Sequence, residues 1–209
     1  MPPIIINMAK KYPNELGRKL LHIGSVFFCL GLIQIFNPGG VAFIIAVATL
    51  STFLADTLGY LDYFKNVKRV SYGHYFMAFG IVVTLILYAM HKSDPALIFA
   101  FLALGVCDPL AVFGRPIYNR LSELRHFHWV KKLTYKGKTV TGSLIFFISA
   151  LALGILTILF SHSNIDILRL IKLTIAAILL TAIEFWSIWG IDNLTLPVGA
   201  FGLYLWVIN

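Results

Sequence analysis

Long apolar runs recur along this chain, and they restrict its possible folds more than any other feature. A helix that crosses about 30 Å of hydrocarbon needs about 20 mostly apolar residues. Seven stretches approach that length: Leu20 to Phe36, Val41 to Leu61, Tyr75 to Met90, Ala96 to Phe113, Gly142 to Phe160, Leu168 to Ile188 and Leu194 to Ile208. The sequence therefore predicts an all-α, polytopic membrane protein with about seven transmembrane helices.

The composition agrees with this class. Of the 209 residues, 59% are hydrophobic and 12% are charged, and the mean hydropathy is +0.85, which excludes an ordinary soluble globular domain. Pro38 and two glycines form a turn sequence after Asn37, which predicts a hairpin of the first two helices. No internal repeat or long linker divides the chain, so we expect a single integral membrane domain over residues 1–209.

The basic residues are distributed unevenly between the loops. If the N-terminus is cytoplasmic, 14 of the 17 lysines and arginines lie inside and 3 lie outside, and this excess predicts the orientation. The net charge of +8 does not indicate nucleic acid, because the basic residues lie in loops between apolar runs and lack stacking aromatics on a soluble module. We expect the cell (inner) membrane rather than the endoplasmic reticulum.

Carboxylates occur inside three apolar runs, each near the predicted cytoplasmic end. These are Asp56, Asp108 and Glu184. Ionisable residues in membrane spans are costly and usually face a bundle interior or an aqueous cavity, so each is a candidate site residue. Several carboxylates at one depth indicate a hard cation. Nucleotide phosphates bring Mg²⁺, which one or two carboxylates hold.

The stretch from Asp108 to Ser143 links two apolar runs and concentrates polar residues. Asp108-Pro109 predicts a helix break at the interface, followed by Gly114 and Arg115. A P-loop is excluded, because Lys132 stands where its first glycine is required and no strand precedes it. Lys138 and Thr139 precede Gly142-Ser143 at the expected start of a helix, where amides and the helix dipole favour an anion. The alternative is a basic stop-transfer loop with a helix cap.

Polar residues near the two ends of the chain are further candidates. Arg18 and His22 lie one helical turn apart and predict a phosphate-facing pair. The alternative is that Arg18 and Lys19 are orientation charges and His22 is an interfacial residue. Asp192 and Asn193 are candidates for the site, or simply caps of the last helix.

Four of these motifs, in this order, resemble a known family. They are Arg18-Lys19-x-x-His22, Asp108-x-x-Ala111-x-x-Gly114-Arg115, Lys138-Thr139-x-x-Gly142-Ser143, and Glu184 followed by Gly190-x-Asp192-Asn193-Leu194-Thr195-x-Pro197. Over about residues 15 to 200 the chain resembles the CTP-dependent polyprenol and diacylglycerol kinases, which include dolichol kinase and phytol kinase and are related more distantly to phosphatidate cytidylyltransferase. The family usually has Glu where this chain has Thr141.

The resemblance implies transfer of the γ-phosphoryl group of CTP to an isoprenoid alcohol or diacylglycerol at the cytoplasmic face. The residues it implies share one membrane layer: Asp108, Glu184, Asp192 and Lys138 for catalysis; Asp108, Asp192 and Glu184 for Mg²⁺; Arg18, His22, Gly114, Arg115, Lys138, Thr139, Gly142, Ser143 and Asn193 for nucleotide and phosphate. Glu184 would serve either the metal or the acceptor hydroxyl.

Two other functions are compatible with the same residues. A cytidylyltransferase would use CTP and metal but attack the α-phosphorus with a lipid phosphate. A transporter or scaffold would explain ionisable residues within the spans, but not their concentration at one interface beside a basic loop. The sequence specifies neither the lipid alcohol nor an oligomeric state.

Overall fold

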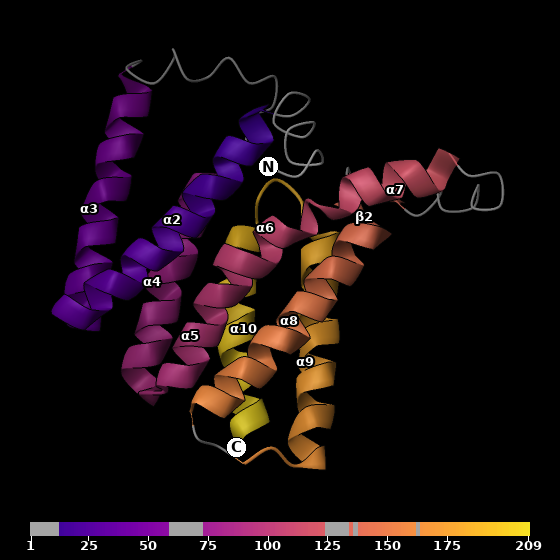
Figure 1. The fold of residues 1–209 in the computed structure, drawn as a ribbon. Coiled ribbons are helices and arrows are strands. Elements are labelled where there is room, and N and C mark those ends of the chain that lie inside the picture. Colours follow the sequence, from indigo (N-terminus) through magenta and orange to yellow (C-terminus); the bar gives the residue numbers. More distant parts are fainter. Residues whose placement is uncertain (1–12, 59–72, 124–133, 136–137, 162–163) are drawn as a thin grey trace.

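The computed structural model places a helix, or a series of helical segments, at each of the seven predicted apolar runs (Figure 1). The structure describes residues 13–58, 73–123, 134–135, 138–161 and 164–209. Its elements are α2 (Pro13–Ile35), α3 (Pro38–Thr57), α4 (Gly73–His91), α5 (Asp94–Leu102), η2 (Ala103–Cys107), α6 (Asp108–Ala111), α7 (Gly114–Glu123), β1 (Thr134–Tyr135), β2 (Lys138–Thr139), α8 (Val140–Phe160), α9 (Ile167–Trp186) and α10 (Asp192–Ile208). The helical class is confirmed; the only described strands form a two-stranded antiparallel pair, β1 with β2.

Four helical stretches of the described residues are long and apolar enough to cross a membrane: Pro38–Ala55, Gly73–His91, Asp94–Asn119 and Val140–Phe160. Two shorter apolar helices are His22–Ile35 and Asp192–Ile208. Helix α9 has 20 residues, but its sequence includes Arg169, Lys172 and Glu184. These apolar helices fit a membrane protein, while the count of about seven spans remains a prediction.

Helices α5 and α10 form the centre of the bundle. The side chains of Phe99 and Phe101 on α5 and of Phe201 and Tyr204 on α10 are fully buried. The rings of Phe99 and Tyr204 stack with centroids 4.8 Å apart. Helix α10 also packs on α4 and α9, whereas α3 lies at the edge of the bundle (Figure 1). The apolar side chains exposed on the outer helices are what a lipid-facing surface requires.

A glycine allows α4 and α10 to approach closely beside the site end of the bundle. A Cβ added at Gly80 would lie 2.5 Å from the main-chain oxygen of Asn193 and 3.2 Å from Cγ of Pro197. Pro197 has no N–H to donate to the carbonyl of Asn193, the residue four positions earlier in α10. Any larger residue at position 80 would therefore push the two helices apart.

The predicted helix break at Asp108-Pro109 is wrong. The backbone of Asp108 is helical, with φ −64° and ψ −43°, and Pro109 occupies the first turn of α6. A proline is tolerated in the first turn of a helix, where its missing N–H is not needed. The irregularity lies just upstream, in the π-helical turn η2, where the N–H of Asp108 donates to the carbonyl of Ala103. Such single π-turns are frequent at functional sites.

Candidate functional site

The described motif residues gather at one end of the bundle. Figure 1 shows α6, β2 and the first turn of α10 at this end, with the C-terminus of the chain at the other. Two groups of charged side chains lie here. We call Lys19, His22 and Asp108 the Asp108 cluster, and Lys138, Glu184 and Asp192 the Lys138 cluster.

The Asp108 cluster joins α2 to α6 across 89 positions of the chain. Lys19 Nζ donates to Asp108 Oδ2 at 2.5 Å, and the two side chains are 10% and 4% exposed. His22 Nδ1 lies 3.4 Å from the same oxygen and makes no hydrogen bond with a described residue. A buried carboxylate is tolerated only when it is paired. Lys19 supplies that partner.

The π-helical turn brings α2 and Asp108 together. Gly105, within η2, packs against α2 so closely that an added Cβ would lie 2.7 Å from Cβ of Val26. Val26 follows His22 by one helical turn on the buried face of α2. Because the backbones can approach at Gly105, Lys19 and His22 reach the carboxylate that begins α6.

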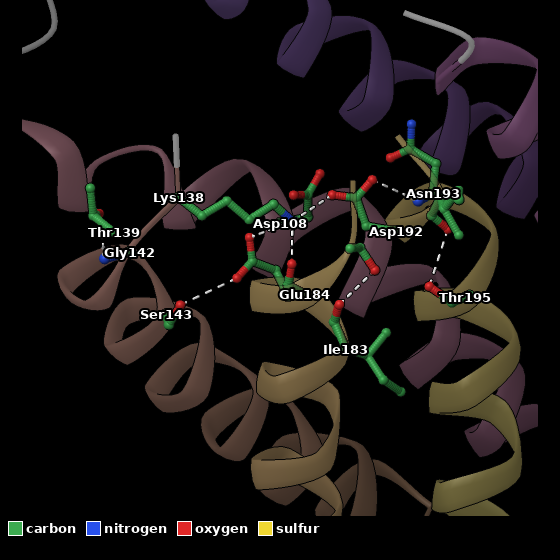
Figure 2. Close-up of polar contacts among 12 residues, drawn as sticks. Asp108, Lys138, Thr139, Gly142, Ser143, Ile183, Glu184, Asp192, Asn193 and Thr195 are labelled. Carbon is green, nitrogen blue, oxygen red and sulfur yellow. Dashed lines mark hydrogen bonds and ion pairs between the residues drawn. The ribbon is translucent and has the colours of Figure 1, made fainter. Parts of the chain in front are cut away.

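The Lys138 cluster joins strand β2 to the ends of two helices (Figure 2). Lys138 Nζ donates to Asp192 Oδ2 at 2.8 Å and to the main-chain carbonyl of Glu184, and it lies 3.1 Å from Glu184 Oε1. Ser143 Oγ donates to Glu184 Oε2 at 3.4 Å. The lysine thus connects the end of α9, which contains Glu184, to the start of α10, which begins at Asp192.

The charge of Lys138 is maintained by these neighbours. Burial alone lowers the pKa of an ammonium group, but attraction to Asp192 and Glu184 outweighs it and raises the pKa of Lys138 above its ordinary value. The lysine is therefore fully charged at neutral pH. The contribution of the charged lysine is present at neutral pH and is lost as the pH rises through the raised pKa.

The start of α8 is held by hydrogen bonds within the protein. The Thr139 hydroxyl caps the helix by accepting from the Gly142 N–H at 3.2 Å. Thr141 Oγ1 donates to the carbonyl of Gly114 at 2.7 Å. A Cβ at Gly114 would lie 2.3 Å from the Gly142 nitrogen. The Gly142 amide is already used, so an anion at this helix start would bind other donors.

The connection from α9 to α10 is tight and strained. Trp189 has a φ of 57°, a conformation that is unfavourable for a bulky side chain, and Gly190 has a φ of 86°. A Cβ at Gly190 would lie 2.7 Å from Cα of Gly73. The Asn193 side chain donates to the carbonyl of Gly73 at 2.7 Å, and α10 has no side-chain cap. Asn193 therefore ties α10 to α4 instead of capping its own helix.

Three residues that the sequence predicted for the site belong to neither cluster. The side chain of Arg18 lies outside the described residues, as does that of Asp56. Arg115 is half-buried in the first turn of α7. Conversely, Lys19 belongs to the site, although the sequence placed it in a family motif without a role of its own, or as an orientation charge. The available signal was its position three residues before His22, which puts both side chains on one helix face.

The carboxylates are suited to a hard cation but do not form a complete metal site. Among the residues with described side chains, no group of three or more His, Cys, Asp or Glu residues is arranged to hold an ion. Asp108 pairs with Lys19, while Asp192 and Glu184 share Lys138. Mg²⁺ commonly takes only one or two carboxylates and completes its shell with water and substrate phosphates. The donor set fits such a shared ion, and not a cage made by protein alone.

The chain is similar to one curated protein of named activity. It is 27% identical over 209 residues to a phytol kinase from Synechocystis sp., covering 97% of this chain and 86% of that protein. No family model matches the chain. No solved structure matches it either. The similarity, which extends over nearly the whole chain, supports a phytol kinase-like family.

Proposed function

We propose that this protein is a membrane lipid-alcohol kinase that transfers the γ-phosphoryl group of CTP to an isoprenoid alcohol such as phytol, or to diacylglycerol. The observation that carries the proposal is the presence of two lysine–carboxylate clusters at one end of an apolar helical bundle. Phosphoryl transfer requires positioned charge rather than covalent chemistry from the protein. The similarity to a phytol kinase supports the choice of a lipid-alcohol acceptor.

In the proposed reaction, some site residues neutralise charge and others bind the metal or accept a proton. The alcohol oxygen attacks the γ-phosphorus, the bond to the β–γ bridging oxygen breaks, and CDP leaves. Basic side chains, including Arg18, Arg115 and His22, neutralise the phosphates, and Glu184 accepts the proton of the alcohol. Asp108 and Asp192 would hold Mg²⁺, which would supply positive charge to the transferring group when bound. The apolar helices admit the lipid tail from the bilayer.

CTP is proposed as the donor because the motifs resemble those of CTP users and the P-loop spacing is missing. The decisive assay combines the purified protein with γ-labelled CTP or ATP and phytol, farnesol, geranylgeraniol, a long polyprenol or diacylglycerol. Label in the lipid, with CDP as co-product and CTP preferred, is expected. Equal or better labelling from ATP removes the claim about the donor. Pyrophosphate and a CDP-lipid would indicate a cytidylyltransferase, and no labelled lipid from any acceptor would refute the kinase.

The proposed arrangement has about seven spans in the cell membrane. The N-terminus and the loop of residues 114 to 141 lie on its cytoplasmic side. The 14 to 3 distribution of basic residues supports it. Ser122→Cys in right-side-out vesicles is expected to resist an impermeant thiol reagent until the membrane is opened. Labelling from outside intact vesicles would overturn both the orientation and the cytoplasmic position of the site.

A further inference from the structure

The two lysines of the site differ in how many of their donors are occupied. An ammonium group has three N–H donors. Lys138 has three acceptors within reach, namely the Glu184 main-chain carbonyl, Glu184 Oε1 and Asp192 Oδ2. It could contact a phosphate only by releasing one of them. Lys138, which the sequence motif assigns to phosphate, therefore uses its three donors within the protein.

Lys19 has the opposite character. Among the residues with described side chains, its one acceptor is Asp108 Oδ2. Beside it, His22 is 4% exposed, and its Nδ1, 3.4 Å from the same carboxylate oxygen, makes no hydrogen bond with the described residues. An unsatisfied polar atom buried to this extent costs free energy and requires an explanation. A ligand that accepts hydrogen bonds would satisfy Lys19 and His22 together.

We propose that Lys19, together with His22, binds the phosphoryl groups of the nucleotide donor, and that Lys138 is a positioning residue that holds Glu184 and Asp192. This inference rests on the proposed kinase function, because it assigns ligands within the same site. Phosphate oxygens are acceptors and carry negative charge, so they can bind a buried lysine and a buried histidine nitrogen that, among the described side chains, face only the Asp108 carboxylate. The phosphate-binding role that the sequence motif gives to Lys138 thus passes to Lys19, and we call this the exchange of roles.

The position of Lys138 supports the second half of the proposal. Its ammonium group contacts Glu184 and Asp192, which lie before and after the strained connection at Trp189. Removing this cation would leave two carboxylates side by side, and their repulsion would move them. Its effect on turnover would then arise from displaced carboxylates and not from a lost phosphate contact.

The test compares Lys19→Met and Lys138→Met in the purified full-length protein. Binding is measured with CTP and with inorganic tripolyphosphate, which presents phosphates without a base, and KM and kcat are measured separately. We expect Lys19→Met to weaken tripolyphosphate binding and raise the KM for CTP about ten-fold or more, the scale of a charge-assisted hydrogen bond. Lys138→Met should keep tripolyphosphate affinity within about three-fold and lower kcat.

Matched controls separate these roles from a loss of folding. Lys172→Met removes a lysine at the opposite end of the bundle, where Nζ donates to the main-chain oxygen of Trp206, and should leave phosphate binding unchanged. Lys19→Arg keeps the pairing charge of Asp108 if Lys19→Met does not fold. In the unmutated protein, tripolyphosphate should protect Lys19, but not Lys138, from reductive methylation, as read by mass spectrometry.

The outcomes discriminate between this inference and the proposed function. Wild-type tripolyphosphate affinity in Lys19→Met, or protection of Lys138 alone, would overturn the exchange of roles even if lipid is phosphorylated. Binding of tripolyphosphate through Lys19 in a protein that labels no lipid would leave the exchange standing and refute the kinase.

Discussion

The Asp108 cluster and the Lys138 cluster use the same chemistry in two different environments. The Asp108 cluster pairs one lysine with one carboxylate, and both side chains are at most 10% exposed. The Lys138 cluster shares one lysine between two carboxylates, and its lysine is 22% exposed. A buried single pair leaves an uncompensated charge when either partner is removed, whereas a shared lysine retains a partner. Stability should therefore depend more on the first cluster, and the arrangement of the reacting groups more on the second.

The largest effect is expected for Asp108→Asn. The amide keeps the shape of the carboxylate but leaves the Lys19 ammonium buried without its counter-charge, which typically destabilises a protein by about 3–5 kcal/mol. Turnover should fall on the order of 10² or more, because the proposed metal ligand is lost. Thermal unfolding in detergent and the rate of lipid phosphorylation measure the two effects. Wild-type turnover with Mg²⁺ dependence intact would show that Asp108 is structural only.

Asp192→Asn should separate turnover from stability. Lys138 keeps Glu184 as a partner, and the Asp192 side chain is 14% exposed, so the midpoint of unfolding should change much less than in Asp108→Asn. The loss of turnover should still be on the order of 10². The same two assays apply. Equal destabilisation by the two substitutions would contradict the difference that we draw between the clusters.

Gly114→Ala tests the close backbone contact between the start of α7 and the start of α8. The added methyl group would lie 2.3 Å from the Gly142 nitrogen, and such overpacking typically costs about 1–3 kcal/mol. We expect a lower unfolding midpoint together with reduced turnover. Gly24→Ala is the matched control, because no described atom outside the neighbouring backbone of its own helix lies within 4 Å of the added group, and alanine favours the helix. If Gly24→Ala lost as much stability and turnover as Gly114→Ala, the effect would not arise from the contact between Gly114 and Gly142.

The smallest effect is expected for Asp94→Asn, at the opposite end of the bundle. Asp94 Oδ1 accepts from the Tyr88 hydroxyl at 2.6 Å, and an asparagine oxygen can accept the same bond. Turnover should be unchanged and stability should change by no more than about 0.5 kcal/mol. A large loss of turnover would show that turnover is sensitive to charge far from both clusters. The effects of Asp108→Asn and Asp192→Asn could then not be assigned to the site.

Much of the helical framework was predictable from the sequence. The predicted run from Gly142 to Phe160 corresponds to α8 (Val140–Phe160), and the run from Leu194 to Ile208 corresponds to α10 (Asp192–Ile208). Helix α2 begins at Pro13, earlier than its apolar run, because polar residues extend a helix beyond the hydrophobic segment. The prediction of a break at Pro109 was wrong, because a proline in the first turn of a helical segment does not interrupt it. The π-helical turn before it was not predicted, because no residue type marks a π-turn as plainly as proline marks a break.

The sequence by itself determined which residues are helical and which polar motifs lie near helix ends, because apolar length and backbone hydrogen bonding act locally along the chain. It also supplied Asp108, Lys138, Glu184 and Asp192 as candidates. Only the tertiary structure decided their partners. Lys19 meets Asp108 from 89 positions away, and Lys138 meets Asp192 from 54 positions away. Charges pair according to distance and burial in the folded chain, and neither quantity is encoded in the spacing of a motif.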